Sequence, residues 1–444
     1  MTLNNQAPFA NRRARLIERM GSDAVAIIAT REEMYRNRDA DYKFRADSSF
    51  YYLTGFAEPE AVAVLSSDSQ QPYTLFCRER NREMEIWNGL RAGIEGAVSD
   101  YSADQAFTID QLDEQIIQFL SDKKRLYVRL GHSDAFDLRV IGWLKKIAAN
   151  QRQGGQPPVE IIQLDSVLDE MRLFKDDFEI NLMRQAAKIS AQAHIRAMQT
   201  VQPDMMEYAL EAEVLYVMQK NGCQTAYNSI VGGGANGCIL HYVENNQPLK
   251  DGDLVLIDAG AELDHYAADI TRTFPVNGKF SVEQKALYEL VLKAQLAAID
   301  AIKSGNHYRL PHEMAVQILT TGLVDLGLLK GSVDELIKSE AYRQFYMHGT
   351  GHWLGMDVHD VGSYKVTQQS NEAEWRPYEA GMVVTVEPGL YIAPDDETVD
   401  ARWRGIGIRI EDDVLVTITG NEVLTKDVPK TVIEIEQLMQ TAQA

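Results

Sequence analysis

Two aspartates at the ends of apolar segments are the first residues of this sequence that could do chemistry. Asp258 ends the segment 254–258, which is apolar on both faces, as expected for a strand buried from both sides. Asp269 lies eleven residues later, in the alternating segment 268–275. If the chain turns back between them, the two carboxylates become cross-strand neighbours, which repel unless a proton or a cation lies between them. A purely structural interpretation, in which Asp258 caps a turn and Asp269 pairs with Arg272, accounts equally well for this pair alone.

Two glutamates repeat this arrangement nearer the C-terminus. Glu387 ends an apolar run and is followed by a proline, which cannot donate a ladder hydrogen bond. In the segment 405–413 the isoleucines fill one face of a predicted strand, and Arg409 and Glu411 lie on the other face. An ordinary buried ion pair between Arg409 and Glu411 is the competing interpretation.

Three histidines, His348, His352 and His359, fall within twelve residues. The four-residue spacing of the first two is similar to that of a zinc-binding pair on a helix. However, Gly349 and Gly351 disfavour a helix, and the general-base glutamate of that motif is missing. The segment therefore predicts a glycine-rich loop that presents imidazoles at a cleft.

One histidine together with four strand-end carboxylates makes an oxygen-rich ligand set. Hard or borderline divalent ions such as Mn²⁺ suit this set better than a structural zinc, which prefers Cys and His. Four carboxylates could offset the charge of two such ions with a shared hydroxide, as in a two-metal hydrolase. His241, His348 and His359 would remain free to donate hydrogen bonds or protons around a tetrahedral intermediate.

The elements that must position these residues fall into two blocks. In the first block, short apolar strands alternate with helical patterns, which is typical of an α/β arrangement. The expected strands are 24–29, 61–65 and 73–77, and the expected helices are 112–120 and 136–148. The second block begins near Phe174 and opens with a long amphipathic helix over 176–200.

The second block continues with a helix that a capping box of Asp204 and Glu207 would begin and Asn221-Gly222 would end. Strands and further helices follow. The expected strands are 254–258, 268–275, 383–387 and 406–417, and the expected helices are 282–302 and 311–326.

The composition excludes several classes of protein. The chain has 444 residues, 45% of them hydrophobic, and its 44 basic and 65 acidic residues give a formal charge of −21. We therefore expect a folded protein that binds neither nucleic acid nor an anionic membrane. The polar, arginine-rich N-terminus is not a secretory signal, the apolar runs are too short for a membrane helix, and the three cysteines are widely spaced. These features predict a cytoplasmic protein without a disulfide framework.

Five ordered motifs resemble the metallopeptidase family that includes aminopeptidase P, prolidase and methionine aminopeptidase. They are LIDAG at 256–260, ADITRTFP at 268–275, HGTGHWLGMDVHD at 348–360, TVEPGLYI at 385–392 and GIGIRIEDD at 405–413. Upstream, the segments 44–56 and 169–175 are similar to the N-terminal domain and linker of bacterial Xaa-Pro aminopeptidases. The resemblance implies an α/β N-terminal domain at 1–173 and an α+β catalytic domain with the pita-bread fold at 174–444.

The resemblance also implies a metal site. Two divalent ions, most simply Mn²⁺, would be bound by five residues: Asp258, Asp269, His352, Glu387 and Glu411. Asp269 and Glu411 would bridge the two ions. Glu387 would also orient or deprotonate the bridging water.

Other residues would contact the substrate. His241 and His359 would stabilise the developing oxyanion, and a further set would line the proline pocket or anchor bridging ligands: His348, Tyr391 and Arg409. In a homo-oligomer, a dimer or tetramer, Trp87 of a neighbouring subunit would help to close the cleft.

The expected activity is release of the N-terminal residue from peptides with proline in the second position. A prolidase restricted to Xaa-Pro dipeptides, a creatinase-like hydrolase without metal, and a non-enzymatic binding protein with the same fold are the alternatives. All five expected ligands are present, which argues against the last two. The polar segment 368–374 before Trp375–Tyr378 is longer than usual for the family, and the sequence assigns no role to Arg376.

Overall fold

The computed structural model describes residues 6–150, 152, 154–367 and 373–443. The chain divides into two compact units, Met1–Asp169 and Glu170–Ala444. The division falls inside helix α7 (Asp165–Leu173), which also contains the last residue of the N-terminal domain expected from the sequence. Most of the polar segment 368–374 lies outside the described residues.

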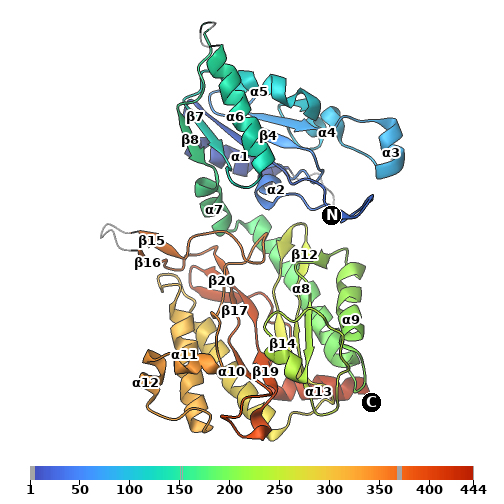
Figure 1. The fold of residues 1–444 in the computed structure, drawn as a ribbon, viewed down its shortest axis with the longest axis vertical. Helices are drawn as coiled ribbons and strands as arrows, with labels where there is room; N and C mark the ends of the chain where they lie inside the picture. The colour runs from blue at the N-terminus through green and yellow to red at the C-terminus, as the bar shows by residue number, and fades with distance from the viewer. Residues whose placement is uncertain (1–5, 151, 153, 368–372, 444) are drawn as a thin grey trace. The chain divides into compact units, whose positions relative to one another are not determined.

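The N-terminal unit is built on a six-stranded mixed sheet with the strand order β6-β5-β4-β1-β7-β8 (Figure 1). β1 pairs with β4 antiparallel and with β7 parallel. The sheet strands are β1 (Ala24–Ala29), β4 (Val62–Ser66), β5 (Tyr73–Cys77), β6 (Gln105–Thr108), β7 (Arg125–Val128) and β8 (Glu160–Gln163), and β2 (Tyr35–Asn37) and β3 (Ala40–Asp41) form a separate hairpin. The helices are α1 (Ala7–Met20), α2 (Ser48–Thr54), α3 (Arg82–Asn88), α4 (Gly93–Ser99), α5 (Leu112–Leu120) and α6 (Asp134–Ala149).

Hydrophobic side chains on both faces of the central strands pack this sheet into the core of the N-terminal unit. Every residue of β4 and β5 is buried, and helices α5 and α6 cover part of the sheet with Ile116 and Trp143. The three strands and two helices expected in this block are therefore present, with ends that differ by at most two residues.

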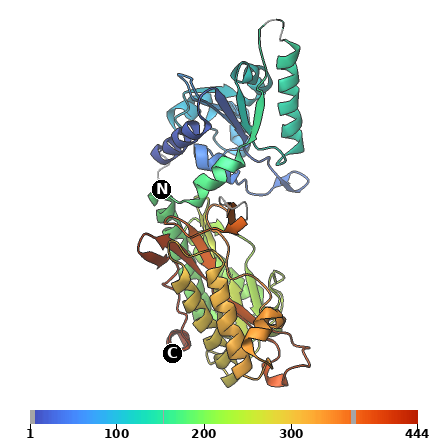
Figure 2. The ribbon, with the colours of Figure 1, turned by 90° about the vertical axis from the view of Figure 1, so that its left-hand side faces the viewer.

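The C-terminal unit consists of small antiparallel sheets between two pairs of helices, which is the pita-bread arrangement. In Figure 1, α8 (Asp177–Thr200) and α9 (Glu207–Lys220) flank the strands on one side, and α10 (Val282–Ala301) and α11 (Leu310–Asp325) flank them on the other. Figure 2 shows α10 and α11 running side by side over the strands. The remaining helices are α12 (Val333–Lys338) and α13 (Val432–Gln443).

The strands of this unit form sheets of two or three strands each. The main sheets are β10 (Ile230–Gly233), β11 (Leu254–Asp258) and β14 (Thr271–Pro275); β17 (Val383–Val386), β20 (Asp412–Thr417) and β21 (Gly420–Val423); and β18 (Gly389–Ile392) with β19 (Ile406–Arg409). Two smaller ones are β9 (Gln224–Thr225), β12 (Ala261–Leu263) and β13 (Tyr266–Ala267); and β15 (Lys365–Thr367) with β16 (Ala373–Trp375).

The expected start of the long helix α8 is confirmed. Asp176 accepts a hydrogen bond from the Glu179 backbone N–H, and the Glu179 carboxylate accepts one from the Asp176 N–H, which is a complete capping box. The second expected capping box is wrong. Asp204 lies outside helix α9, whose N-cap is Met206. Glu207 instead accepts hydrogen bonds from the Gly233 N–H and the Tyr242 hydroxyl, which draws its carboxylate away from the helix end.

Two expected strands are shorter than the sequence pattern indicates. Residues 268–270 are irregular, so that β14 begins at Thr271, and the expected strand 406–417 is broken between β19 and β20. β11 and β14 do pair antiparallel, but the residue opposite Asp258 is Thr271. Asp269 therefore reaches Asp258 from the loop before β14 rather than from a paired position.

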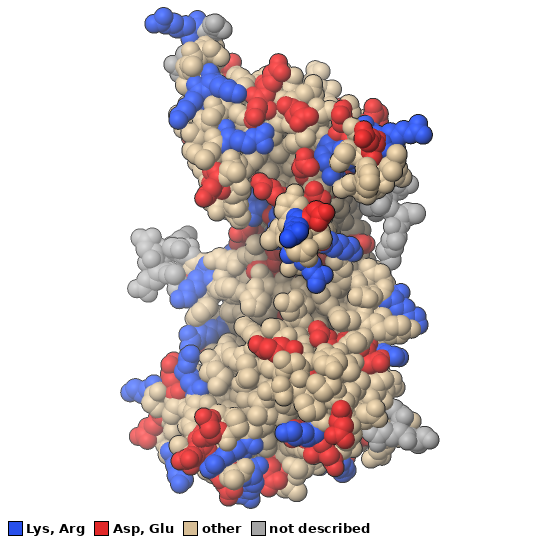
Figure 3. Space-filling model, turned by 45° about the vertical axis from the view of Figure 1, so that its right-hand side comes forward, with Lys and Arg blue, Asp and Glu red and all other residues tan. Residues whose placement is uncertain are grey.

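Acidic and basic side chains are interspersed over the face of each unit shown in Figure 3. None of the helices in the described part of the chain is both long and apolar enough to cross a membrane. The cysteines Cys77, Cys223 and Cys238 are free thiols, as the wide spacing predicts.

Candidate active site

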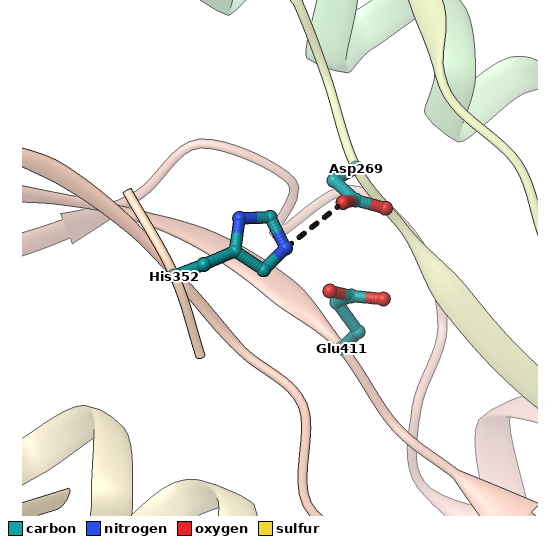
Figure 4. Close-up of side chains that lie close together, drawn as sticks. All are labelled: Asp269, His352 and Glu411. Atoms are coloured by element: carbon teal, nitrogen blue, oxygen red, sulfur yellow. Dashed lines mark ion pairs between the residues drawn. The ribbon is translucent and has the colours of Figure 1, made fainter. Parts of the chain in front are cut away.

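Carboxylates from separate strand ends meet His352 in the C-terminal unit. Asp258 is the last residue of β11, Glu387 follows β17, and Glu411 lies between β19 and β20. Asp269, His352 and Glu411 each offer one ligand atom, and these three atoms lie within 4.8 Å of one another (Figure 4). The side chains of Asp269 and Glu411 are buried.

The imidazole of His352 is oriented for binding a cation. Its Nδ1 lies 3.0 Å from the Trp353 carbonyl oxygen, to which it donates, and so Nε2 faces the carboxylates. Nε2 lies 3.5 Å from Asp269 Oδ2 and 3.7 Å from Glu387 Oε1. Burial lowers the pKa of His352, but these two carboxylates outweigh it and raise the pKa to about 9. In the metal-free protein the His352 imidazole is therefore protonated, and its positive charge offsets part of the charge of these carboxylates.

The carboxylates around His352 carry more negative charge than the protein neutralises. Burial raises the pKa of Asp258, and burial and the three neighbouring carboxylates raise the pKa of Glu411 well above its usual range. Burial raises the pKa of Glu387 to about 7, although His352 and Arg409 oppose this. Since four carboxylates, two of them buried and two half-buried, and one imidazole are the donors that two hard or borderline dications prefer, the residues present fit such a pair of ions.

Tyr227 belongs to this cluster, and the sequence analysis missed it. Its hydroxyl lies 2.6 Å from Asp258 Oδ1 and 2.5 Å from Asp269 Oδ1. One hydroxyl proton can be donated to only one of the two carboxylates at a time. Burial and both aspartates raise the pKa of Tyr227 well above its usual range, so that the phenol stays protonated. No motif surrounds Tyr227, because it reaches the site from an irregular segment between β9 and β10.

The structural interpretations considered for these charges are wrong in their pairings. Arg272 pairs with Asp412 rather than with Asp269, at 2.7 Å. Arg409 pairs with Asp258 rather than with Glu411, at 2.6 Å. Glu411 accepts a hydrogen bond from the Thr271 hydroxyl at 2.6 Å, and no cationic side chain pairs with it within the described residues.

A chain of contacts leads from Arg409 to His348. The Arg409 guanidinium donates to the Tyr391 hydroxyl at 3.2 Å, and that hydroxyl lies 2.9 Å from His348 Nε2. His348 Nδ1 lies 2.7 Å from the Gly349 carbonyl oxygen. Because burial, then Arg409, lowers the pKa of His348 to about 3, its ring is neutral, donates through Nδ1 and accepts from Tyr391 at Nε2. Both ring nitrogens are thus engaged, which suits a wall of the site.

The remaining sequence-predicted residues lie in different surroundings. His359 is exposed, and its ring centroid is 4.0 Å from that of His352. His241 is also exposed and lies in the turn after Leu240. Trp87 lies in the N-terminal unit, at the end of α3, with 80% of its side chain exposed.

Two glycines allow the strand ends to approach one another. A Cβ atom at Gly260 would overlap the carbonyl oxygen of Ala268, and one at Gly351 would overlap the carbonyl oxygen of Thr385. These contacts bring Asp258 towards Asp269 and His352 towards Glu387. Any larger residue would push the pairs of ligands apart.

Arg376 and a neighbouring cavity complete the surroundings. Arg376 forms a bidentate ion pair with Glu170 of α7, at 3.2 and 2.5 Å. A cavity of about 350 Å³ lies against His348 and Thr350. His312 Nδ1 lies 2.8 Å from the Thr350 hydroxyl, and the Thr350 carbonyl accepts from the Glu387 N–H at 2.8 Å, so that the loop is tied to Glu387.

This geometry agrees with comparisons to known proteins. The model of metallopeptidase family M24 matches residues 181–418, and the model of the aminopeptidase P N-terminal domain matches residues 9–127. The chain therefore belongs to metallopeptidase family M24.

Particular members of the family are similar over their whole length. The chain is 46% identical to an Xaa-Pro aminopeptidase of Escherichia coli over 98% of both chains. The structure of Pseudomonas aeruginosa aminopeptidase PepP matches with a TM-score of 0.96 and 53% identity, over 99% of this chain and 98% of that one. Zinc-substituted E. coli aminopeptidase P in complex with product matches with a TM-score of 0.95 and 45% identity, over 99% of both chains.

Proposed function

We propose that this chain is a metal-dependent aminopeptidase that releases the N-terminal residue from peptides with proline in the second position. The observation that carries the proposal is the convergence of Asp269, Glu411 and the Nε2 atom of His352, whose ligand atoms lie within 4.8 Å of one another. Full-length similarity to Xaa-Pro aminopeptidases supplies the substrate class. The prolidase and the non-enzymatic alternatives are not favoured by these relatives.

Five residues would hold two divalent ions, for which we propose Mn²⁺: Asp258, Asp269, His352, Glu387 and Glu411. When bound, such ions supply Lewis acidity and lower the pKa of a coordinated water. Glu387, whose Oε1 lies 3.7 Å from His352 Nε2, would also orient this water or accept its proton.

Residues around the carboxylates would bind and orient the peptide. We assign His241 and His359 to the substrate carbonyl, because both expose their imidazoles and can donate a hydrogen bond there. His348, Tyr391 and Arg409 form a connected wall and are assigned to the proline side chain. The contact between Arg409 and Asp258 then links that wall to the metal ligands.

We further propose a cytoplasmic homo-oligomer. The three free cysteines suit a reducing compartment. On the N-terminal unit, Ile86, Trp87 and Leu90 expose 77%, 80% and 83% of their side chains, which suits burial against another subunit. Trp87 is assigned to the cleft of that neighbouring subunit.

The decisive experiment compares a tripeptide and a dipeptide that share the same Xaa-Pro start. The metal-loaded enzyme should release the first residue from both, and a chelator should abolish both reactions. Cleavage of the dipeptide alone would identify a prolidase. Full activity in protein shown to be metal-free would overturn the proposal.

A further inference from the structure

The exposed imidazole of His359 lacks side-chain support of its own. Within the described residues its ring takes part in no hydrogen bond or ion pair, and its ring contact is with His352. An exposed side chain that must contact a substrate atom needs a fixed backbone. The residues that fix this backbone are therefore of interest.

Asp360, the residue after His359, is buried, whereas His359 is exposed. Its side chain is 0% exposed, and both carboxylate oxygens are engaged by cations. Asp360 Oδ1 lies 2.6 Å from Arg172 Nη2, and Asp360 Oδ2 lies 3.0 Å from Lys175 Nζ. Arg172 and Lys175 are themselves 2% and 1% exposed, and so this is a fully desolvated triad.

The same arginine also reaches the other side of His359. Arg172 Nη2 lies 2.7 Å from the carboxylate of Asp357, whose side chain is 34% exposed. One guanidinium nitrogen thus spans the two aspartates that bracket Val358-His359 in the sequence. Among the ion pairs of the described residues, two cations face two carboxylates here, in contrast to the carboxylates around His352.

Backbone contacts close the loop around this cluster. The Asp360 N–H donates to the Trp353 carbonyl at 2.9 Å, and the Gly355 N–H donates to the Asp357 carbonyl at 3.1 Å. A Cβ atom at Gly355 would overlap the Asp360 carboxylate, so that the loop folds tightly over it. The Gly355 carbonyl accepts from the Ala267 N–H at 2.8 Å, which ties the loop to the chain leading into Asp269.

We propose that Asp360 is the positioning residue of His359, and that Arg172 and Lys175 of the linker segment 169–175 hold it in place. The inference rests on the proposed function only in giving His359 a substrate to contact. It assigns a role to a motif, DEMRLFK, that the metal site and the substrate contacts leave unused. Asp360 itself is buried behind the loop and acts through His359.

The first test measures kcat and KM of the manganese-loaded enzyme on an Xaa-Pro tripeptide. Asp360→Asn and Arg172→Met should lower kcat by roughly ten- to hundredfold, with metal content unchanged, because a displacement of about 1 Å costs this much. Arg172→Lys should restore part of the rate, since it keeps the charge but not the forked geometry. Lys175→Met, which leaves the pair of Arg172 and Asp360 intact, should have a smaller effect.

The matched control is Glu170→Gln. Glu170 lies on the same helix and forms an ion pair with Arg376 instead of with Asp357 or Asp360 of the His359 loop. This variant should keep kcat within about twofold of wild type, as expected for a site that shares no partner with the loop. A loss equal to that of Arg172→Met would show that the helix acts as a whole and would overturn the proposal.

A double mutant separates positioning from general stability. In the His359→Ala background, adding Asp360→Asn should lower kcat by less than about twofold, because the residue through which Asp360 acts is already gone. A full additional loss would overturn the proposal. Arg172→Lys and Lys175→Met keep the test decisive if Asp360→Asn fails to fold.

The last test needs no catalysis and so stands apart from the proposed function. The imidazole resonance of His359 in isotopically labelled protein loaded with diamagnetic Zn²⁺ should shift or broaden in Arg172→Met but not in Glu170→Gln. If wild type cleaves no Xaa-Pro peptide, the proposed function fails while this measurement still decides the positioning. An unchanged His359 resonance in Arg172→Met would refute it.

Discussion

Glu411 and Asp412 are adjacent, buried carboxylates with opposite electrostatic surroundings. Asp412 lies 2.7 Å from Arg272 Nη2 and 2.7 Å from Lys430 Nζ, and Gln295 donates to it as well. Burial favours its neutral form, but the two cations outweigh burial and lower the pKa of Asp412 to about 2. Glu411 has a hydroxyl donor and three like-charged neighbours, and its pKa is raised well above the usual range.

The difference shows which buried carboxylates are neutralised by cationic side chains of the protein itself. At Asp412 the chain supplies the counter-charge, so that removing either partner leaves an unpaired ion in the interior. At Glu411 the counter-charge must be a proton or a cation from solution. Two adjacent residues thus differ in kind: Asp412 is paired with cations of the protein, whereas no cationic side chain of the described residues pairs with Glu411.

Glu411→Gln should produce the largest change in activity. It removes a carboxylate that we propose as a metal ligand while leaving the ion pair of Asp412 in place. We therefore expect kcat/KM to fall by at least roughly a hundred- to thousandfold, the scale of a lost electrostatic contact in a reaction site. Steady-state rates and metal content of the purified variant measure this. A metallated variant that kept more than a tenth of the wild-type rate would show that Glu411 is not a ligand.

Asp412→Asn should have the larger effect on stability. Arg272 would keep its buried charge without its partner, which costs about 3–5 kcal/mol of the free energy of unfolding. Urea unfolding of the metal-free protein measures the difference from wild type. Glu411→Gln is the control, and it should be neutral or stabilising there, because it removes the free-energy cost of keeping this carboxyl protonated beside three other carboxylates. Equal destabilisation by both variants would remove the contrast between the two carboxylates.

Glu387 should make the stability of the metal-free protein depend on pH. Its folded pKa of about 7 exceeds the usual value of 4.5, so that the folded state retains a proton that the unfolded chain has lost between these values. This contribution is fully present below pH 4.5 and is lost as the pH rises through 7, a change of about 3 kcal/mol. The difference in unfolding free energy between wild type and Glu387→Gln, followed across this range, isolates it. A flat difference would contradict the raised pKa.

Metal ions should stabilise the wild-type protein by binding only to the cluster of carboxylates around His352. At a free Mn²⁺ concentration of about one hundred times Kd, the free energy of unfolding should rise by about 2.7 kcal/mol. Glu411→Gln should show a smaller rise at the same concentration. Thermal or urea unfolding with and without Mn²⁺ tests this, and an equal rise in both proteins would place the bound metal elsewhere.

The sequence was sufficient for the parts of the fold that depend on local pattern. The buried strand that ends at Asp258 and the long helix over 176–200 follow from hydrophobic periodicity. Asp204 shows the limit of such patterns. Glu207 satisfies the pattern of a capping box, yet distant backbone and hydroxyl donors take its carboxylate.

The sequence did not predict which charged and polar side chains of the site pair with one another. Arg272 and Arg409 each had an acidic candidate close by in the sequence, Asp269 and Glu411, yet they pair with Asp412 and Asp258, which lie 140 and 151 residues away along the chain. Tyr227 gave no signal at all, because it meets Asp258 across 31 residues of chain. Such contacts depend on how the strand ends are placed in space rather than on any spacing along the chain.

Gly260 and Gly351 carry no functional group, yet the lack of a side chain there lets the backbone approach that brings together the four proposed ligands Asp258, Asp269, His352 and Glu387. In a saturation mutagenesis screen these two positions should therefore be as intolerant as the acidic residues themselves. Their variants would differ in kind, because an alanine there leaves every donor atom in the protein and alters only the spacing. Intolerance to substitution at these two glycines would thus report on the spacing of the site residues, whereas intolerance at Glu411 would report on the need for its carboxylate.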